Sequence, residues 1–260
     1  MTDPVLVSTT DGLTTVTINR PKALNALDVS TKEALLDAIV TASSDPQCRA
    51  VLLTGSGDRA FCVGQDLREH VGNLAGDDPL ATVHKHFNPV ASALYEMPKP
   101  VVAAVRGAAA GAGASLAFLA DFRIGGPSTA FTMAFAGIGL AADTGASHTL
   151  PRLVGPSIAA RMLMLNERVD ADRAHALGLL THLTDDDEDV LPRATELATT
   201  LANGPTICFA QIKQQLRQEG GFTEALEAEA RAQAACGYTE DHVAAVDAFV
   251  NKRPPVFKGR

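Results

Sequence analysis

Apolar residues in the first half of the chain follow strand patterns. Val5–Thr9 and Leu13–Ile18 alternate in character on either side of Asp11-Gly12, which predicts a β-hairpin. Two continuous apolar runs, Arg49–Thr54 and Val101–Val105, predict strands that are buried on both faces. A shorter apolar segment begins at Ala60 and stops at Gly64. Several short strands separated by helical segments indicate an α/β protein.

Helical spacing appears between these strands. Ser30 and Glu33 form a capping-box pattern before an apolar face at Leu35, Leu36, Ile39 and Val40. Leu80–Met97 is also helical in pattern, and Pro98 and Pro100 end it. The segment Arg68–Pro79 is polar and contains glycine, so we expect a mobile loop or lid there.

The pattern changes from strand-rich to helical near Asp189. We therefore divide the chain into a strand-rich core over residues 1–188, which holds the functional site, and a helical region over residues 189–260. Apolar residues recur at helical spacing in the second part, as at Leu226, Ala230 and Ala234. Such a face can pack on the core or on another copy of the chain.

One stretch, Lys99–Gly155, carries the strongest chemical signal. Its buried strand Val101–Val105 leads into a glycine-alanine turn at Gly107–Ala114, and the apolar run Leu116–Leu119 then reads as a helix. A strand, tight turn and helix aim unpaired backbone N–H groups at one point. Small residues in such a turn let a ligand approach the backbone closely.

Composition narrows the classes of function. The chain has 260 residues, 46% of them hydrophobic, which suffices for a sizeable core. A net charge of -8 argues against nucleic acid as a partner, because phosphate binding needs a basic face. No long apolar run predicts a membrane span, and Met1–Ser8 lacks the features of a secretory signal. The four cysteines form no metal-ligand or C-x-x-C spacing, so we expect reduced thiols in a cytoplasmic protein.

A nicotinamide site fits the glycine turn poorly. Gly107-x-x-x-Gly111-x-Gly113 and Tyr95-x-x-x-Lys99 both occur in short-chain dehydrogenases, but Pro98 would break the helix that must carry the tyrosine and the lysine. The turn also lies past residue 100, and no acid follows at the distance that holds a ribose. Ser115 lacks the closing glycine of a nucleophile elbow.

Segments along nearly the whole chain resemble the crotonase (enoyl-CoA hydratase/isomerase) superfamily. The matching segments are INRPKALNAL at Ile18–Leu27, GDRAFCVGQDL at Gly57–Leu67, KPVVAAVRGAAAGAGASLA at Lys99–Ala117, ADFRI at Ala120–Ile124, LPRLVG at Leu150–Gly155 and KRPPVFKG at Lys252–Gly259. The resemblance implies a ClpP/crotonase-like fold of repeated ββα units. It also implies that the C-terminal helices form a trimer or a dimer of trimers.

The same resemblance implies an oxyanion hole for an acyl-CoA thioester. Its donors would be the backbone N–H groups of Gln65 and Ala112, which stabilise an enolate or a tetrahedral oxyanion. Coenzyme A would enter with the substrate, with no metal or separate cofactor. The residues that would contact it are Ala23, Leu24, Val63, Gln65, Asp66, Leu67, Phe257 and Lys258.

Two positions depart from the hydratases of this family. The two glutamates that a typical hydratase carries correspond here to Ser115 and Phe135. Adding water to a double bond needs one group that activates water and one that delivers a proton, and neither residue titrates near neutral pH. The usual hydratase machinery is therefore missing.

Asp143 is the remaining candidate for an acid or base. It stands in a segment without other charges, and Asp143-Thr144-Gly145 is similar to the D-[ST]-G motif of the ring-1,2-epoxyphenylacetyl-CoA isomerase branch. Burial would raise the pKa of such a carboxyl into a useful range. The alternative is a structural role, in which Asp143 caps a helix that starts at Thr144. His148 is a weaker candidate for lining the acyl pocket, and packing is the simpler role for it.

These observations favour an enoyl-CoA isomerase that uses Asp143 to move a proton along the acyl chain. Such a reaction shifts a double bond or rearranges a ring, as in phenylacetate degradation or fatty acid metabolism. The alternatives are an enoyl-CoA hydratase, a non-catalytic acyl-CoA-binding homologue, and an enzyme in which the aspartate is a nucleophile in dehalogenation or hydrolysis.

Overall fold

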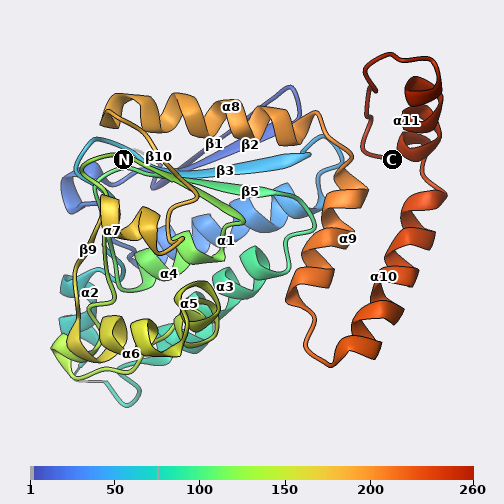
Figure 1. Ribbon diagram of the computed structural model, residues 1–260. Coiled ribbons are helices and arrows are strands. Elements are labelled where there is room, and N and C mark those ends of the chain that lie inside the picture. Colours follow the sequence, from blue (N-terminus) through green and yellow to red (C-terminus); the bar gives the residue numbers. More distant parts are fainter. Residues whose placement is uncertain (1–2, 75) are drawn as a thin grey trace.

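The N-terminal hairpin forms one edge of a six-stranded sheet in the computed structural model, which describes residues 3–74 and 76–260 (Figure 1). β1 (Val5–Thr10) and β2 (Leu13–Ile18) pair antiparallel across Asp11-Gly12, as predicted. The sheet has the order β1-β2-β3-β5-β7-β10, and every pair after the hairpin is parallel. The further strands are β3 (Ala50–Gly55), β5 (Val101–Val105), β7 (Phe122–Gly125) and β10 (His182–Leu183).

A second sheet has four short strands in the order β4-β6-β8-β9. They are β4 (Ala60–Cys62), β6 (Ala108–Ala110), β8 (Ala130–Thr132) and β9 (Val169–Asp170). The pairs β3–β4, β5–β6 and β7–β8 each give one strand to each sheet before the chain enters a helix. This is the predicted repeat of ββα units. Strand β6 lies inside the segment that we expected to be only a turn.

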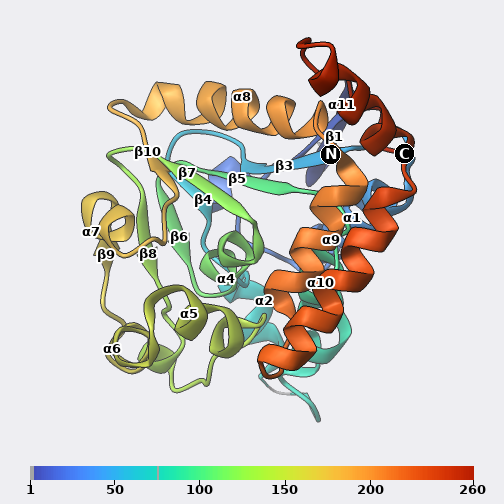
Figure 2. The same cartoon turned by 45° about the vertical axis from the view of Figure 1, so that its right-hand side comes forward.

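Helices cover both faces of the six-stranded sheet (Figures 1 and 2). On one face, α8 packs on an apolar layer through Val190, Ala194, Ala198 and Ala202. The helices of the other face include α1, α3 and α4. Their bounds are α1 (Val29–Ser44), α3 (Asn88–Tyr95), α4 (Ala112–Leu119) and α8 (Val190–Ala202). The predicted boundary near Asp189 thus lies before a helix that packs against the core sheet.

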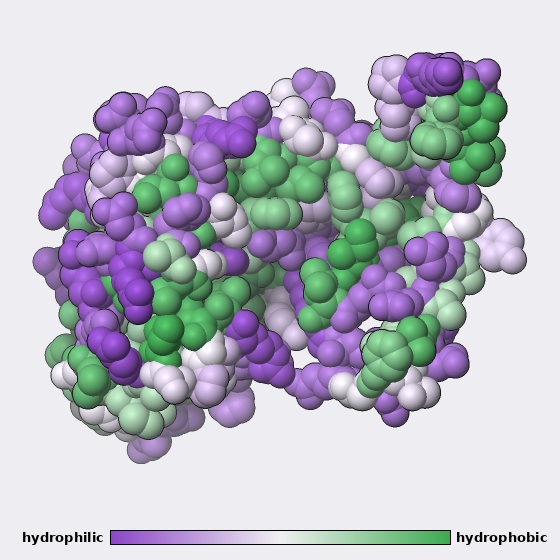
Figure 3. All heavy atoms as spheres, viewed as in Figure 1, coloured by the Kyte–Doolittle hydropathy of each residue, from purple (hydrophilic) through white to green (hydrophobic). Residues whose placement is uncertain are grey.

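The last three helices form an arm beside the core (Figure 1). They are α9 (Thr206–Arg217), α10 (Phe222–Gly237) and α11 (Glu240–Val250). Lys213 attaches α9 to the core, because its Nζ donates to Lys99 O over 2.7 Å and to Asp121 Oδ2 over 2.5 Å. Apolar side chains gather on this arm in Figure 3, and Leu216, Phe222 and Phe249 are at least 80% exposed.

The remaining helices are short and lie mostly around the second sheet. They are η1 (Pro21–Ala23), α2 (Leu67–Asn73), the π-helix η2 (Val83–Phe87), η3 (Ala136–Ile138), α5 (Ala146–Val154), α6 (Pro156–Leu165), α7 (Ala171–Ala176) and η4 (Asp187–Asp189). No helix among residues 3–74 and 76–260 is long and apolar enough to cross a membrane.

Three local predictions need correction. Asp28, not Ser30, caps α1, because its carboxylate accepts from Thr31 N over 2.9 Å and Ser30 already lies inside the helix. Val40 is half exposed, since the buried face of α1 turns away from it. The expected loop after Arg68 begins instead with α2, whose first turn Asp66 caps through Arg68 N.

Candidate active site

Two chain segments meet at the point where an oxyanion hole was expected. The turn after β4 contains Gly64 with φ of +84°, and the turn before α4 contains Gly111 with φ of +51°. A Cβ at Gly64 would lie 3.1 Å from Ala112 N and 3.0 Å from Ala110 O. Only glycine at position 64 therefore lets the two turns approach so closely.

The two proposed donor groups are free in the described part of the chain. Leu27 N donates to Gly64 O and Asp66 N donates to Leu27 O, over 2.8 and 3.1 Å, so these bonds use the backbone groups on either side of Gln65. The N–H of Gln65 points away from this bridge, because alternate groups of an extended chain face opposite sides. Ala112 is the first residue of α4, where an N–H has no partner within the helix.

A cavity of about 870 Å³ opens beside these donors. Its wall includes seven of the ten residues predicted for the site: Ala23, Val63, Gln65, Asp66, Leu67, Ala112 and Asp143. Leu24 lies next to the wall in an αL conformation, with its N–H bonded to Pro21 O. Seven of the predicted residues therefore share one cavity wall, drawn from η1, the β4 turn, α2, α4 and the segment before α5.

Phe257 and Lys258 lie elsewhere in the same chain. The tail packs against the arm, where Lys258 N and Gly259 N donate to the Asp241 carboxylate over 2.6 and 2.8 Å. Arg49 holds it from the core side through a bond to Phe257 O. Within one chain these residues do not line the cavity.

Asp143 lines the cavity and forms no ion pair with any residue of 3–74 or 76–260. Thr144 Oγ1 donates to its Oδ1 over 2.7 Å. Burial raises the pKa of the Asp143 carboxyl above its ordinary value, against the Thr144 hydrogen bond and the Lys32 charge, which lower it. The structural alternative was that Asp143 caps a helix starting at Thr144. The helix α5 instead begins at Ala146, and its N-cap residue is Gly145.

The other three carboxylates of the wall are tied to the protein. Arg20 pairs with Asp28 at 2.9 Å and with Asp66 at 3.0 Å, and each aspartate also caps a helix. Hydrogen bonds to the charged form lower the pKa of both aspartates against the opposing effect of burial, and Arg20 adds to the lowering. Glu69 uses one oxygen for Val29 N and the other for Lys32 Nζ.

The two positions at which the resemblance implies hydratase glutamates hold groups that do not titrate near neutral pH. Ser115 is fully buried, and its hydroxyl donates to Gly111 O over 3.2 Å. Phe135 lines the cavity as an apolar surface and is 7% exposed. His148 lies off the wall and contacts Tyr95 OH at 3.2 Å, which agrees with a packing role.

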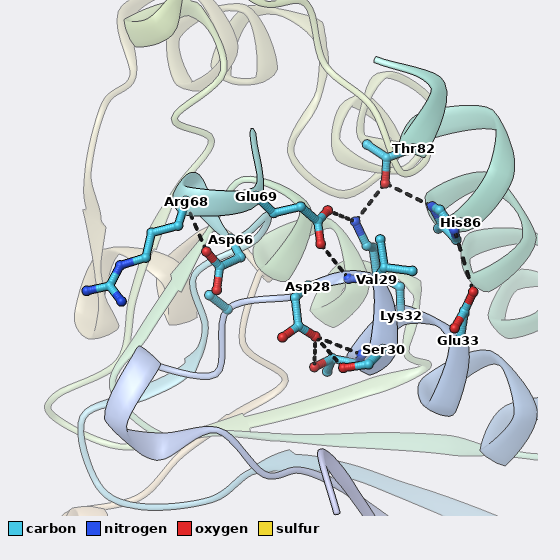
Figure 4. Close-up of polar contacts among 12 residues, drawn as sticks. Asp28, Val29, Ser30, Lys32, Glu33, Asp66, Arg68, Glu69, Thr82 and His86 are labelled. Atoms are coloured by element: carbon cyan, nitrogen blue, oxygen red, sulfur yellow. Dashed lines mark hydrogen bonds and ion pairs between the residues drawn. The ribbon is translucent and has the colours of Figure 1, made fainter. Parts of the chain in front are cut away.

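Lys32 and Glu69 were missed by the sequence reasoning. Glu69 fell in the expected loop, although its place three residues after Asp66 is a helix-start signal. Lys32 also had a signal, because its spacing of three and seven residues from Leu35 and Ile39 places it on the buried face of α1. A buried lysine requires a partner, and Glu69 provides it (Figure 4).

Comparisons with known proteins agree with this geometry. The family model described as enoyl-CoA hydratase/isomerase matches residues 8–260. The chain belongs to the enoyl-CoA hydratase/isomerase (crotonase) family. A crystal structure from Mycobacterium abscessus, described as an enoyl-CoA hydratase/isomerase, superposes with a TM-score of 0.95 at 44% identity, covering 98% of this chain and 100% of that one. The chain therefore has the crotonase fold.

Two curated relatives of this crotonase carry names for different reactions. A Rhodobacter capsulatus protein named "probable enoyl-CoA hydratase" is 40% identical over 254 residues, which are 96% of each chain. The 1,2-epoxyphenylacetyl-CoA isomerase of Escherichia coli is 35% identical over an alignment of 264 positions, gaps included, which covers all of both chains. The family establishes an acyl-CoA enzyme, and the choice of reaction depends on the residues of the site.

Proposed function

We propose that this crotonase is an enoyl-CoA isomerase in which Asp143 is the single acid/base. The observation that carries the proposal is the state of the four cavity carboxylates. Asp28, Asp66 and Glu69 are each held by a cation or a helix N-terminus, whereas Asp143 accepts one hydroxyl bond. It is the acid on this wall that is free to exchange a proton with a substrate.

In this mechanism the thioester oxygen would accept from Gln65 N–H and Ala112 N–H. Two preorganised donors stabilise the enolate that forms when a proton leaves the α carbon. Asp143 would take that proton and return it to another carbon of the same acyl group, so that no atom is gained or lost. A raised pKa suits this role, because the carboxyl must both accept and release the proton near neutral pH.

A panel of acyl-CoA substrates tests the proposal. The purified protein should isomerise at least one unsaturated or ring-bearing acyl-CoA, and Asp143→Asn should lower that turnover by about 10²–10⁴, the usual share of acid–base catalysis. Calorimetry should show that the variant still binds the acyl-CoA. Isomerase turnover close to wild type in Asp143→Asn would remove Asp143 from the mechanism.

Hydration is the second candidate, favoured by the name of the Rhodobacter capsulatus relative. It would require Asp143 alone to activate water and deliver a proton, because Ser115 and Phe135 supply no second group. A non-catalytic acyl-CoA-binding protein is the third, and it would bind the whole panel without converting any member. Product analysis by mass spectrometry separates the three, since hydration adds 18 Da and isomerisation adds nothing.

The assembly belongs to the same proposal. We propose a cytoplasmic trimer, or a dimer of trimers, in which the exposed apolar side chains of the arm face a second copy. Phe257 and Lys258 would then contact coenzyme A in a neighbour's cavity rather than in their own. Support comes from the exposure of Leu216, Phe222 and Phe249 and from the way Asp241 fixes the tail.

A further inference from the structure

A lysine is buried directly behind the cavity wall. The Lys32 side chain is 1% exposed, and its Nζ donates to Glu69 Oε1 over 2.7 Å and to Thr82 Oγ1 over 2.6 Å. The Phe87 ring lies 4.9 Å from the same nitrogen. Apolar residues of similar volume usually stabilise a core at least as well as a buried ion pair does. Stability alone therefore gives little reason for a charge at this position.

Glu69 connects that lysine to the active-site turn. Its Oε2 accepts from Val29 N over 2.6 Å, and its Oε1 accepts from Lys32 Nζ, so α2 is fastened to the first turn of α1 (Figure 4). Helix α2 starts at Leu67, two residues after the proposed donor Gln65. A displacement of α2 would move this donor with it.

The charge of Lys32 also acts on Asp143, which lines the same cavity as Glu69. It lowers the pKa of the Asp143 carboxyl and so opposes the larger effect of burial. Glu69 lines the cavity beside it and carries the opposite charge. Removing Lys32 and removing Glu69 should therefore change the electrostatic field at Asp143 in opposite directions.

We propose that Lys32 and Glu69 are positioning residues of this active site, seating α2 against α1 and setting the field in which Asp143 exchanges its proton. The inference rests on the proposed role of Asp143. The pair does not touch the substrate carbon in this scheme. It acts through the position of Gln65 and through the charge on Asp143.

The other charged groups near Asp143 are accounted for separately. Helix α4 carries none, and on α5 His148 contacts Tyr95 while Arg152 bonds His148 O and Glu219. Across the cavity, Arg20 is neutralised by two aspartates. The further lining groups with charge are Lys22, Arg68 and His70. Because histidine can change its charge near neutral pH, His70→Gln is measured alongside the test variants.

The test follows the ionisation of Asp143 in full-length protein. The acid limb of kcat/KM for isomerisation and the ¹³C NMR shift of the Asp143 carboxyl are measured against pH in wild type, Lys32→Met and Glu69→Gln. Lys32→Met should move both to higher pH, and Glu69→Gln should move both to lower pH. The expected size is about 0.3–1 pH unit, as for a charge that acts without direct contact. Lys85→Met is the matched control, because Lys85 is an exposed lysine on η2, the segment that also carries Phe87.

Opposite shifts support the proposal, because a displacement of α2 without any effect of charge would move the profiles of both variants in the same direction. Shifts of equal sign, or none, overturn it when circular dichroism shows intact folds. If Lys32→Met fails to fold, the shift in Glu69→Gln decides alone, because glutamine has the length of glutamate and keeps one oxygen that can accept a hydrogen bond. Full turnover in Asp143→Asn would instead refute the proposed function. The carboxyl titration followed by NMR would still report on the pair in that case.

Discussion

Thr144 Oγ1 donates a 2.7 Å hydrogen bond to Asp143 Oδ1 from a backbone with φ of +53°. A β-branched residue is rarely found in this region, and holding it there costs roughly 1–3 kcal/mol. Such strain gathers at functional sites, where the surrounding structure enforces it. Here the strained residue is buried at 1% exposure and its hydroxyl holds Asp143, the acid to which we assign the proton transfer.

Removing the Thr144 hydroxyl should shift the pH dependence of the enzyme. The bond lowers the pKa of Asp143, so Thr144→Val should raise that pKa further and move the acid limb of kcat/KM to higher pH. Thr144→Ser keeps the donor and should leave the limb in place. A pH–rate profile of the three proteins measures this. An unchanged limb in Thr144→Val would contradict the role given to the bond.

Asp143→Asn should increase stability at neutral pH. Burial holds the pKa of Asp143 above its ordinary value of 3.8 in the folded protein. Its contribution to stability is therefore present below the unfolded pKa and is lost as the pH rises through the folded one. Urea unfolding at pH 4 and pH 7.5 should show a gain for the variant only at the higher pH. Equal midpoints at pH 7.5 would mean that the carboxyl is not destabilised by burial.

Hydration of crotonyl-CoA should be much slower than isomerisation of a suitable substrate. The Ser115 hydroxyl donates a hydrogen bond to Gly111 O, and Phe135 is apolar. Neither side chain therefore replaces a hydratase glutamate. Loss of one acid–base group usually costs about 10²–10⁴ in rate. The assay follows absorbance of the enoyl thioester for both reactions on one protein preparation. Hydration as fast as isomerisation would show that another carboxylate of the wall, such as Glu69, is released during the reaction.

Chain patterns predicted the hairpin, the buried strands and the glycine turn, whereas the ββα fold and the candidate site residues were predicted from the family resemblance, and neither source predicted the supporting contacts. The hairpin, the buried strands and the turn before α4 can be predicted from apolar periodicity and the positions of glycines. These signals lie within a few neighbouring residues of the sequence. The helix Leu67–Asn73 was missed although Asp66, followed by Glu69 three residues later, is a local helix-start signal, because the polar, glycine-containing segment was interpreted as a loop. The bond between Glu69 and the distant Val29 gives no local signal. The Lys32–Glu69 pair spans 37 positions, so only the fold reveals it.

Lys213→Met should loosen the arm. Its ammonium bonds both Asp121 and Lys99 O, and Asp121 also accepts from Val101 N at the start of β5. Losing charged hydrogen bonds of this kind costs about 2–3 kcal/mol. Urea unfolding should show the loss, and Lys85→Met, at an exposed site, should not. A change below about 0.5 kcal/mol, typical of a surface substitution, would show that the arm is held by other contacts.

Light scattering should give a mass of at least three times 27.1 kDa. Lys258→Met should then weaken coenzyme A binding, most strongly at low salt, because lysine attracts a phosphate as a compact charge. The substitution is preferable to deleting the tail, since Asp241 is 4% exposed and depends on two tail N–H groups. Lys252→Met is the control. A monomer at micromolar concentration would refute the assembly, and unchanged affinity would refute the role of Lys258.

The position of α8 has a consequence for synthesis on the ribosome. Among the described residues, those that line the cavity lie between Arg20 and Asp143, so they are all synthesised while residues 144–260 are still to be translated. The outer face of the large sheet is complete only later. Leu52, Val102 and Ile124 remain bare until Val190–Ala202 emerges to cover them. A nascent chain of this crotonase therefore exposes an apolar face of the sheet until α8 is synthesised, and transiently exposed surface of this kind is what chaperones bind.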